Sequence, residues 1–267
     1  MRLGKHYNIV FFICFIIICG IIVYSCGADI FVRIQKYLLL ADRENLYRII
    51  ESIPTETISL QNMPIEMKNH IRVFRVPEID NPTKKANHIL KIFLEKYNEY
   101  EHYKNDHVIF DELSFSGGYF PTIHTDIEWN KIKNEGIQFW LLEKNENPRN
   151  IGNMFLFFNT HLYDKYNNAG IVLKARNNSI VVLSNTLIPH ELETIPVDDF
   201  KRQTKKFYLN IMPNECIMFH KNVLHMSDYR TLSDKRKSLN FRVYRKGSHG
   251  KVIFSNNFNG FSRDLMI

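Results

Sequence analysis

A succession of short β-rich runs constrains the fold of this chain more than any other feature of its sequence. From Val108 onward the runs are rich in Val, Ile, Leu and Phe, and turn clusters separate them. Many short strands at such spacing favour a sandwich or a barrel over alternating strand–helix units. The expected strands span residues 108–110, 137–142, 154–158, 170–174, 179–183, 207–211, 216–219, 239–244 and 252–254.

Two helices are expected before this β-rich region. Apolar residues recur at three- and four-residue steps over 30–53 and again over 84–100, as on the buried face of an amphipathic helix. Residues 54–82 are loop-like, apart from a short expected strand at 71–76. The expected divisions are an N-terminal segment over 1–28, a helical stalk and loop over 29–83, and a mainly β domain with a flanking helix over 84–267.

The N-terminal segment contains a stretch, residues 7–28, without any acidic or basic side chain. As a helix its roughly 22 residues would be about 33 Å long, which is enough to cross a bilayer. A cleaved signal peptide has a shorter apolar core. A lipoprotein cleavage site at Cys26 would have the bulky Tyr24 where a small residue is usual. We expect a retained single-pass anchor over 1–28, with the two cleaved forms as alternatives.

The charges around this stretch leave the orientation of the anchor nearly balanced. Arg2 and Lys5 precede the stretch. Arg33, Lys36 and Arg43 follow it. Because positive residues favour the cytosolic side and the N-terminal tail is short and cationic, we expect a cytosolic N-terminus. The large β-rich domain would then be lumenal or extracytoplasmic.

Composition excludes several classes of protein. Hydrophobic residues make up 45% and charged residues 24% of the chain, as in globular proteins and unlike disordered or multi-span proteins. The net charge of +7 is scattered apart from short clusters at 201–206 and 235–237, so we expect no nucleic-acid partner. Three of the four cysteines lie in or beside the apolar stretch. Cys216 alone cannot form a disulfide framework or a Cys-rich zinc site.

Three features of the β-rich region carry the chemistry. His124 and Asp126 lie two residues apart and so point the same way if the segment is extended. A strand and turn over 213–225 end on a second histidine, His225. Two imidazoles and one carboxylate on one face of a metal suit a non-haem Fe(II) oxygenase, because the opposite face stays open. Arg236, eleven residues further on, could hold a distal carboxylate in a planar bidentate pair.

The order and spacing of these residues resemble the phytanoyl-CoA dioxygenase family of Fe(II)- and 2-oxoglutarate-dependent oxygenases. That family has an H-x-D motif, a distal His about a hundred residues on and an Arg eleven residues later. A Ser two positions after the distal His corresponds to Ser227. Further similarities are a strand ending on Trp140, a turn at Ile151-Gly152-Asn153 and Asn159-Thr160-His161. The resemblance covers roughly residues 108–246.

The resemblance implies a double-stranded β-helix (jelly roll) domain, preceded by one N-terminal transmembrane helix. His124, Asp126 and His225 would be the metal ligands, and Arg236, Ser227 and Trp140 would lie in the cosubstrate site. The protein would be a 2-oxoglutarate-dependent dioxygenase. It would use Fe(II) and O₂ to hydroxylate a C–H bond, and it would release succinate and CO₂. Because related halogenases lack the carboxylate ligand, Asp126 favours hydroxylation over halogenation. The substrate is not identified by the sequence.

Several alternatives remain open at this point. His220 and His161 are alternative ligands, although only His225 has the family's spacing to Arg236. The usual Gly after the distal His is replaced by Met226, which would narrow the pocket. Trp140 is also a typical core residue. Lys235, Arg230 and Arg242 could replace Arg236 as the anchor. The alternative function is a non-catalytic binding domain displayed on a membrane.

Overall fold

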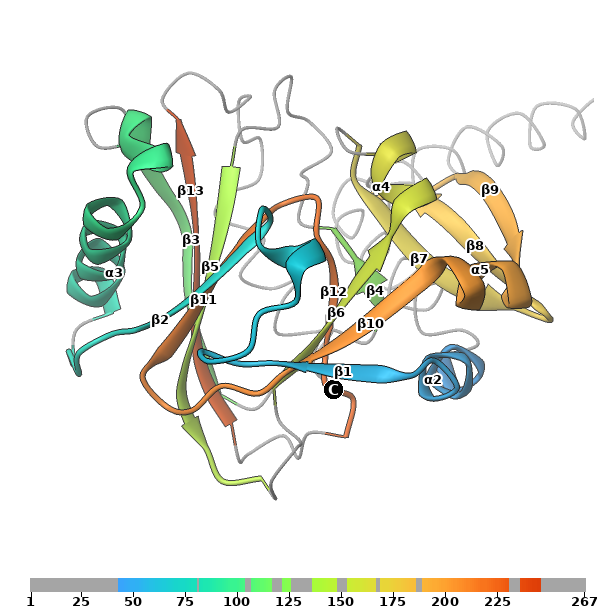
Figure 1. The fold of residues 1–267 in the computed structure, drawn as a ribbon, viewed down its shortest axis with the longest axis horizontal. Helices are drawn as coiled ribbons and strands as arrows, with labels where there is room; N and C mark the ends of the chain where they lie inside the picture. Colours follow the sequence, from blue (N-terminus) through green and yellow to red (C-terminus); the bar gives the residue numbers. More distant parts are fainter. Residues whose placement is uncertain are drawn as a thin grey trace, which may run out of the picture. The chain divides into compact units, whose positions relative to one another are not determined.

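A computed structural model describes most of one compact unit, which extends from Asp42 to Ile267 (Figure 1). The preceding residues, including the expected anchor over 1–28, lie outside the described part. In the described part, no helix has the length and the apolar character that a membrane span requires. The described residues are 43–80, 82–103, 107–116, 122–125, 136–147, 153–166, 169–185, 189–230 and 236–245.

Two β-sheets form the described part of the domain. The larger sheet contains, in spatial order, β1 (Thr55–Ile58), β10 (Thr204–Leu209), β6 (Met154–Asn159), β12 (Leu224–Ser227), β4 (Ile123–His124), β7 (Ile171–Arg176), β8 (Ser179–Ser184) and β9 (Glu191–Pro196). The smaller sheet contains β2 (Ile71–Arg75), β11 (Glu215–His220), β5 (Gly136–Asn145), β13 (Arg236–Arg245) and β3 (His107–Ser116). Neighbours are antiparallel except β1 and β10, which run parallel.

The strand pairing is nested, and this pattern defines the fold. β3 pairs with β13, β4 with β12, β5 with β11 and β6 with β10, so the first of these eight strands meets the last and the fourth meets the fifth. Along the chain most consecutive members alternate between the two sheets. Eight antiparallel strands wound in this way form a jelly roll. The mainly β, jelly-roll-like architecture expected from the sequence is therefore present.

An insertion between β6 and β10 enlarges one sheet of the roll. It contains α4 (Thr160–Tyr166), the strands β7, β8 and β9, and α5 (Val197–Gln203). β7 pairs with β4 and extends the larger sheet beyond it. The two-residue strand that carries His124 therefore has a partner on each side.

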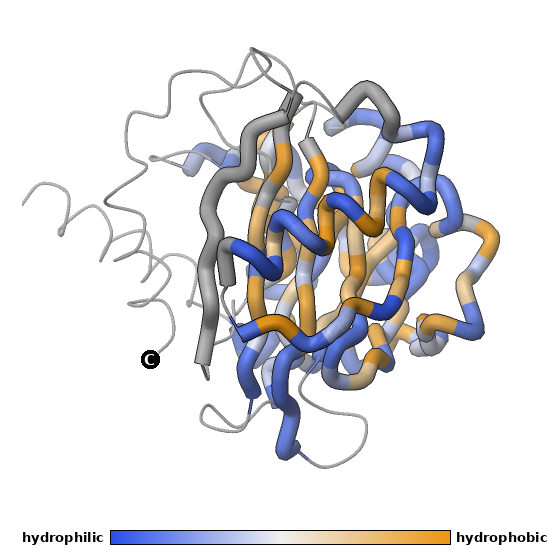
Figure 2. The backbone as a smooth tube through the Cα atoms, turned by 90° about the vertical axis from the view of Figure 1, so that its left-hand side faces the viewer, coloured by the Kyte–Doolittle hydropathy of each residue, from blue (hydrophilic) through white to orange (hydrophobic). Residues whose placement is uncertain are grey.

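Apolar side chains form three layers of the core. Between the sheets lie residues such as Trp140, Leu156 and Phe219. The helix α3 (Pro82–Lys96) covers the outer face of the smaller sheet, and Figure 2 looks onto its alternating hydrophilic and hydrophobic residues. The helix α2 (Arg43–Glu51) joins the core on the outer face of the larger sheet through buried side chains that include Ile49 and Ile50. Central strands of each sheet are thus buried on both faces, which explains the nearly continuous apolar runs of β6 and β11.

The structure corrects the domain boundary expected at residue 84. The described part of the expected stalk belongs to the compact unit, which starts at Asp42. Within it, α2 is part of the core, β1 pairs with β10 and β2 pairs with β11. The helical period over 43–51 is as expected, but a helix with a buried face needs a surface to pack against, and here the larger sheet provides it. The sequence analysis also did not predict α4, α5, β1, β4, β9 or β12, and the expected strand over 252–254 lies outside the described residues.

Candidate metal and carboxylate site

The jelly roll brings His124 and His225 side by side. They are directly opposite one another on the neighbouring strands β4 and β12. Both side chains are buried, and their ring centroids are 4.3 Å apart with 48° between the planes. Met226 belongs to the outer core layer, so the alternation of side chains along β12 directs His225 between the two sheets. Phe219 of β11, in the layer between the sheets, contacts the His225 ring edge-on at 4.9 Å.

The same backbone interaction orients both imidazoles. The Nδ1 atom of His124 lies 3.1 Å from the carbonyl oxygen of Thr122, and that of His225 lies 3.0 Å from the carbonyl oxygen of Val223. A carbonyl oxygen only accepts, so each Nδ1 must carry the hydrogen. In the neutral ring the lone pair then belongs to Nε2. A metal-binding histidine typically has such a partner on its other nitrogen, because it fixes the tautomer and the ring orientation.

The third expected ligand, Asp126, lies outside the described residues. Thr125, directly before it, is fixed to β7 by two hydrogen bonds. Its N–H donates to the Ile171 carbonyl, and its hydroxyl accepts from the Ile171 N–H, both at 3.0 Å. Within the described residues alone, no group of three or more His, Cys, Asp or Glu side chains is placed to bind a metal. The role of Asp126 therefore stays a prediction.

The two alternative histidines have other partners. Nε2 of His220 lies 3.0 Å from the Tyr100 hydroxyl, and burial lowers the pKa of His220 to about 4. His161 is exposed on α4, where its Nε2 lies 3.1 Å from a carboxylate oxygen of Glu193. The ring of His220 lies near His70, with 6.4 Å between their centroids. The structure brings together only His124 and His225 among these candidates.

Arg236 begins β13 and is a buried cation. Its Nη1 donates to the Asn153 carbonyl oxygen at 3.1 Å, and its guanidinium carbon lies 5.8 Å from the centre of the Trp140 ring. Burial lowers the pKa of Arg236 to about 10, so the side chain is still charged at neutral pH. Arg236 and Trp140, both expected in the cosubstrate site, therefore lie together. Trp140 is also part of the hydrophobic core between the sheets, as its alternative interpretation predicted.

Ser227 lies between the histidine pair and Arg236. It follows His225 by two residues on β12 and therefore faces the same side of the strand. It pairs with Met154 on β6, directly after the Asn153 whose carbonyl binds Arg236. Two residues of antiparallel strand correspond to about 7 Å. His225, Ser227 and Arg236 thus follow one another along the space between the sheets.

Sequence analysis missed Ser238, which follows Arg236 by two residues and faces the same side of β13. Ser238 is only 1% exposed, and its hydroxyl has no hydrogen-bond partner within the described part of the chain. A buried hydroxyl without a partner costs about 1–3 kcal/mol. A ligand oxygen beside Arg236 would satisfy it. The R-x-S spacing was a usable signal, since residues two apart on a strand share a face.

The other cations considered as anchors are placed differently. Arg230 binds the carboxylate of Asp228 in a bidentate manner, with Nε–Oδ1 and Nη2–Oδ2 distances of 2.8 Å. This contact raises the pKa of Arg230. Arg242 lies opposite Gln138 in the smaller sheet, and Lys235 lies outside the described residues. Of these cations, Arg236 is the one that the structure places against Trp140.

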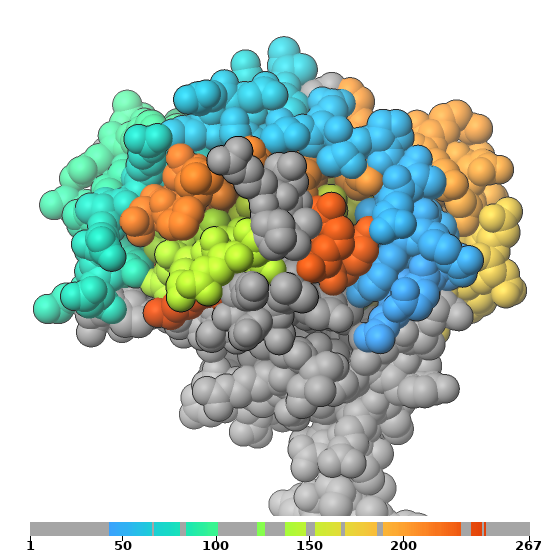
Figure 3. All heavy atoms as spheres, turned by 90° about the horizontal axis from the view of Figure 1, so that it is seen from below, coloured from blue at the N-terminus to red at the C-terminus, as the bar shows by residue number. Residues whose placement is uncertain are grey.

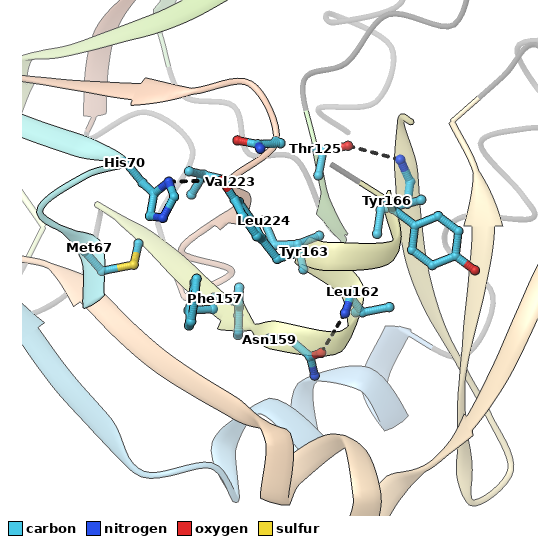
Figure 4. Close-up of a pocket in the computed structure, with 13 residues that line it drawn as sticks. Met67, His70, Thr125, Phe157, Asn159, Leu162, Tyr163, Tyr166, Val223 and Leu224 are labelled. Carbon is cyan, nitrogen blue, oxygen red and sulfur yellow. Dashed lines mark hydrogen bonds between the residues drawn. The ribbon is translucent and has the colours of Figure 1, made fainter. Parts of the chain in front are cut away.

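A pocket beside α4 includes Thr125 and Val223 in its lining, close to the two histidines, but neither histidine lines it (Figure 4). It is lined mainly by apolar and aromatic side chains, among them Phe157, Leu162 and Leu224. Phe157 and Leu224 belong to the outer core layer of the larger sheet. Since Leu224 and His225 are consecutive on β12, their side chains point to opposite faces. These two walls of the pocket therefore face away from the histidine pair.

Comparisons with known proteins add little to this geometry. No family model matches the sequence, and no curated protein matches it. A crystal structure of a prolyl-4-hydroxylase from Pseudomonas putida is similar with a TM-score of 0.30 and 10% identity, over 65% of this chain and 72% of that chain. A similarity of this size carries no argument about function. The resemblance to the phytanoyl-CoA dioxygenase family therefore stays a prediction from motif spacing.

Proposed function

We propose that this chain is an Fe(II)- and 2-oxoglutarate-dependent dioxygenase of the phytanoyl-CoA dioxygenase type that hydroxylates a C–H bond. The observation that carries the proposal is the cross-strand pair of His124 and His225, with both Nδ1 atoms held by backbone carbonyls. Its support is that a sequence-predicted pair about a hundred residues apart meets inside a jelly roll, with the predicted cation Arg236 buried in the same interior.

The residues present fit an Fe(II) centre. Two neutral imidazoles would offer Nε2, and Asp126, two residues after His124, would complete a two-histidine, one-carboxylate set. Bound iron would supply the activation of O₂ that is coupled to decarboxylation of 2-oxoglutarate to succinate and CO₂. The Thr122 and Val223 carbonyls would hold the two rings in the orientation that binding requires.

The cation and hydroxyls beside Asn153 fit the far carboxylate of 2-oxoglutarate. Arg236 would donate charge-assisted hydrogen bonds to that carboxylate, and Ser227 and Ser238 would add hydroxyls from either side. Trp140 would form the wall against which the guanidinium lies. The step of about 7 Å from His225 to Ser227 suits an extended five-carbon dicarboxylate whose other end reaches the metal. Burial of these groups would keep water away from the reacting end.

We also propose that the enzyme is anchored in a membrane by residues 7–28, with the catalytic domain on the lumenal or extracytoplasmic side. The support is the uncharged length of that stretch and the cationic tail before it. The substrate class is left unassigned, and no nucleic-acid partner is proposed. The competing function is a binding domain that takes up a carboxylate ligand without turnover.

The ligand assignment is tested with His225→Ala and Asp126→Ala in the full-length chain. Loss of a supporting partner alone typically costs about 10–100-fold, so loss of a ligand should reduce succinate formation from 2-oxoglutarate by at least about 100-fold and lower the iron content. His161→Ala is the matched control, because this exposed histidine on α4 contacts Glu193 and lies outside the candidate site. Normal iron content and turnover in His225→Ala would falsify the site. Binding of 2-oxoglutarate without succinate formation in the wild type would favour the binding domain.

A further inference from the structure

Asp228 is a fully buried carboxylate at the end of β12, directly after Ser227. The Tyr208 hydroxyl donates to its Oδ2 at 3.0 Å. Arg230 donates from Nε and Nη2 at 2.8 Å, and the Arg230 backbone N–H donates to Oδ1 at 3.0 Å. A buried carboxylate is stable only with such partners. The Asp228 carboxylate therefore connects Tyr208 of β10 with Arg230 just beyond β12.

The backbone of Asp228 shares an acceptor with the guanidinium of Arg236. The Asp228 N–H donates to the Asn153 carbonyl oxygen at 3.0 Å, and Nη1 of Arg236 donates to the same oxygen at 3.1 Å. The Tyr208 hydroxyl, which donates to Asp228, also accepts from the Asn153 N–H at 3.4 Å. Tyr208 thus holds the N–H of Asn153, and Asp228 holds the carbonyl oxygen to which Arg236 also donates.

The charges in this region also depend on Asp228. Arg230 and Lys206 both lie over the Phe155 ring, at 5.4 and 5.7 Å from its centre. The Lys206 ammonium donates to the Ile50 carbonyl at 2.6 Å. Asp228 attracts both Arg230 and the buried Arg236. Without its negative charge, several cations would repel one another in a poorly solvated region, and the side chains would move apart.

We propose that Asp228 is the positioning residue for the far-carboxylate end of the site. Through Tyr208, Arg230 and its own N–H, it fixes Ser227 and the Asn153 carbonyl, and so aims Arg236 at an incoming five-carbon dicarboxylate. It does not touch the ligand. This inference rests on the proposed function and adds a residue that no motif in the sequence marks.

The test compares two ligands on the full-length Asp228→Asn variant. 2-Oxoglutarate spans the metal end and the arginine end, whereas oxalate is long enough for the metal end only. Both are titrated by calorimetry into the protein loaded with Mn(II), which avoids turnover. We expect 2-oxoglutarate to bind at least about tenfold more weakly, equivalent to about 1.4 kcal/mol, while the affinity for oxalate changes by less than about twofold. A general loss of structure would weaken both ligands.

Three further variants make the test specific. Asp199→Asn is the matched control, because Asp199 is on the exposed side of α5 and pairs with Arg202 at 2.6 Å. Tyr208→Phe keeps every charge and removes one hydroxyl, so it should weaken 2-oxoglutarate binding less than Asp228→Asn does, and it stays informative if the latter folds poorly. In an Arg236→Gln background, Asp228→Asn should have almost no additional effect, since residues that act through one another are not additive.

Each outcome decides between the two proposals. Equal weakening of both ligands, no weakening of either, or an undiminished effect in the Arg236→Gln background would overturn the positioning role and leave the proposed function standing. If the metal-loaded wild type does not bind 2-oxoglutarate, the proposed function is overturned, and the role of Asp228 with it.

Discussion

Arg236 combines burial, charge and a fixed position, and these are the properties that selective binding of a carboxylate requires. Its exposed fraction is 5%, and its partners include a backbone carbonyl and an indole ring. A planar guanidinium in such a place can form two parallel hydrogen bonds to a carboxylate, which a lysine cannot. The far end of the candidate site is therefore expected to discriminate between 2-oxo acids with and without a second carboxylate.

Replacing Arg236 by Leu should affect the cosubstrate and spare the metal. A charge-assisted hydrogen bond contributes about 1.5–3 kcal/mol, so the apparent Michaelis constant for 2-oxoglutarate should rise by at least about tenfold. Iron content should stay nearly unchanged, because the histidine pair is on other strands. The measurements are succinate formation against 2-oxoglutarate concentration and metal analysis. An effect in Arg242→Leu without one in Arg236→Leu would place the anchor further along β13.

At the residue scale, the sequence was informative where chemistry depends on residue type and spacing. It predicted that His124 and His225 lie together and that Arg236 is the candidate anchor for a carboxylate. It could not predict Asn153 or Asp228, because their roles follow from cross-strand register, and register is fixed only when two strands are paired. The position of Asp126 remains a sequence-based prediction.

At the element scale, α2 shows how a correct helix can be assigned to the wrong role. Its apolar period indicated a helix but did not reveal the surface beneath it. In the structure Tyr229 stacks on Tyr47 with 4.2 Å between ring centroids and donates to Glu51 at 2.6 Å. Lys206 binds the Ile50 carbonyl near the end of the helix. Figure 3 shows the segment around residues 226–230, in orange-red, beside α2 in blue. The helix is thus part of the domain.

Ile50→Ala tests this role of α2. Ile50 is completely buried, and removal of such a side chain typically costs about 2–5 kcal/mol, since a cavity remains. We expect a loss of stability in that range, measured by urea unfolding, and almost none for the exposed Arg48→Ala on the same helix. If Ile50→Ala unfolds like the wild type, the helix is a stalk after all.

The strands that the sequence did not reveal have identifiable physical reasons. β4 has two residues and β12 has four, so neither is long enough to show a period. β9 is largely polar because it is an outer strand of the larger sheet. The longer buried strands, such as β6 and β11, carry enough apolar residues to be recognised locally. Local pattern therefore predicted the walls of the roll, and pairing between distant segments was needed to place the site.

At the scale of the whole molecule, the expected membrane anchor is the main question for experiment. Each Ile or Phe at the centre of a span contributes about 0.3–0.6 kcal/mol to insertion, and residues 7–28 contain many of them. The full-length chain should therefore remain with membranes after washing with alkaline carbonate. Recovery in the wash, or a mature N-terminus at or near Cys26, would show that the segment is not a retained span.

Protease added to sealed vesicles tests the orientation separately. If Arg2 and Lys5 stay in the cytosol, the jelly-roll domain is enclosed and should be protected from the protease until detergent is added. A luminal marker protein provides the control for vesicle integrity. Digestion of the domain in intact vesicles would reverse the orientation without affecting the anchor itself.

The nested pairing of the roll has a consequence for the order in which the molecule assembles. The inner pair β6–β10 and the outer pairs β4–β12 and β3–β13 enclose successively longer stretches of chain. Closing longer loops costs more entropy, and folds dominated by such distant contacts form slowly, in milliseconds to seconds. Because the histidine pair and Arg236 belong to the outermost closures, these residues come together only when the long loops between their strands close. If the proposed site binds iron, we expect the iron to load after these outer strands have paired.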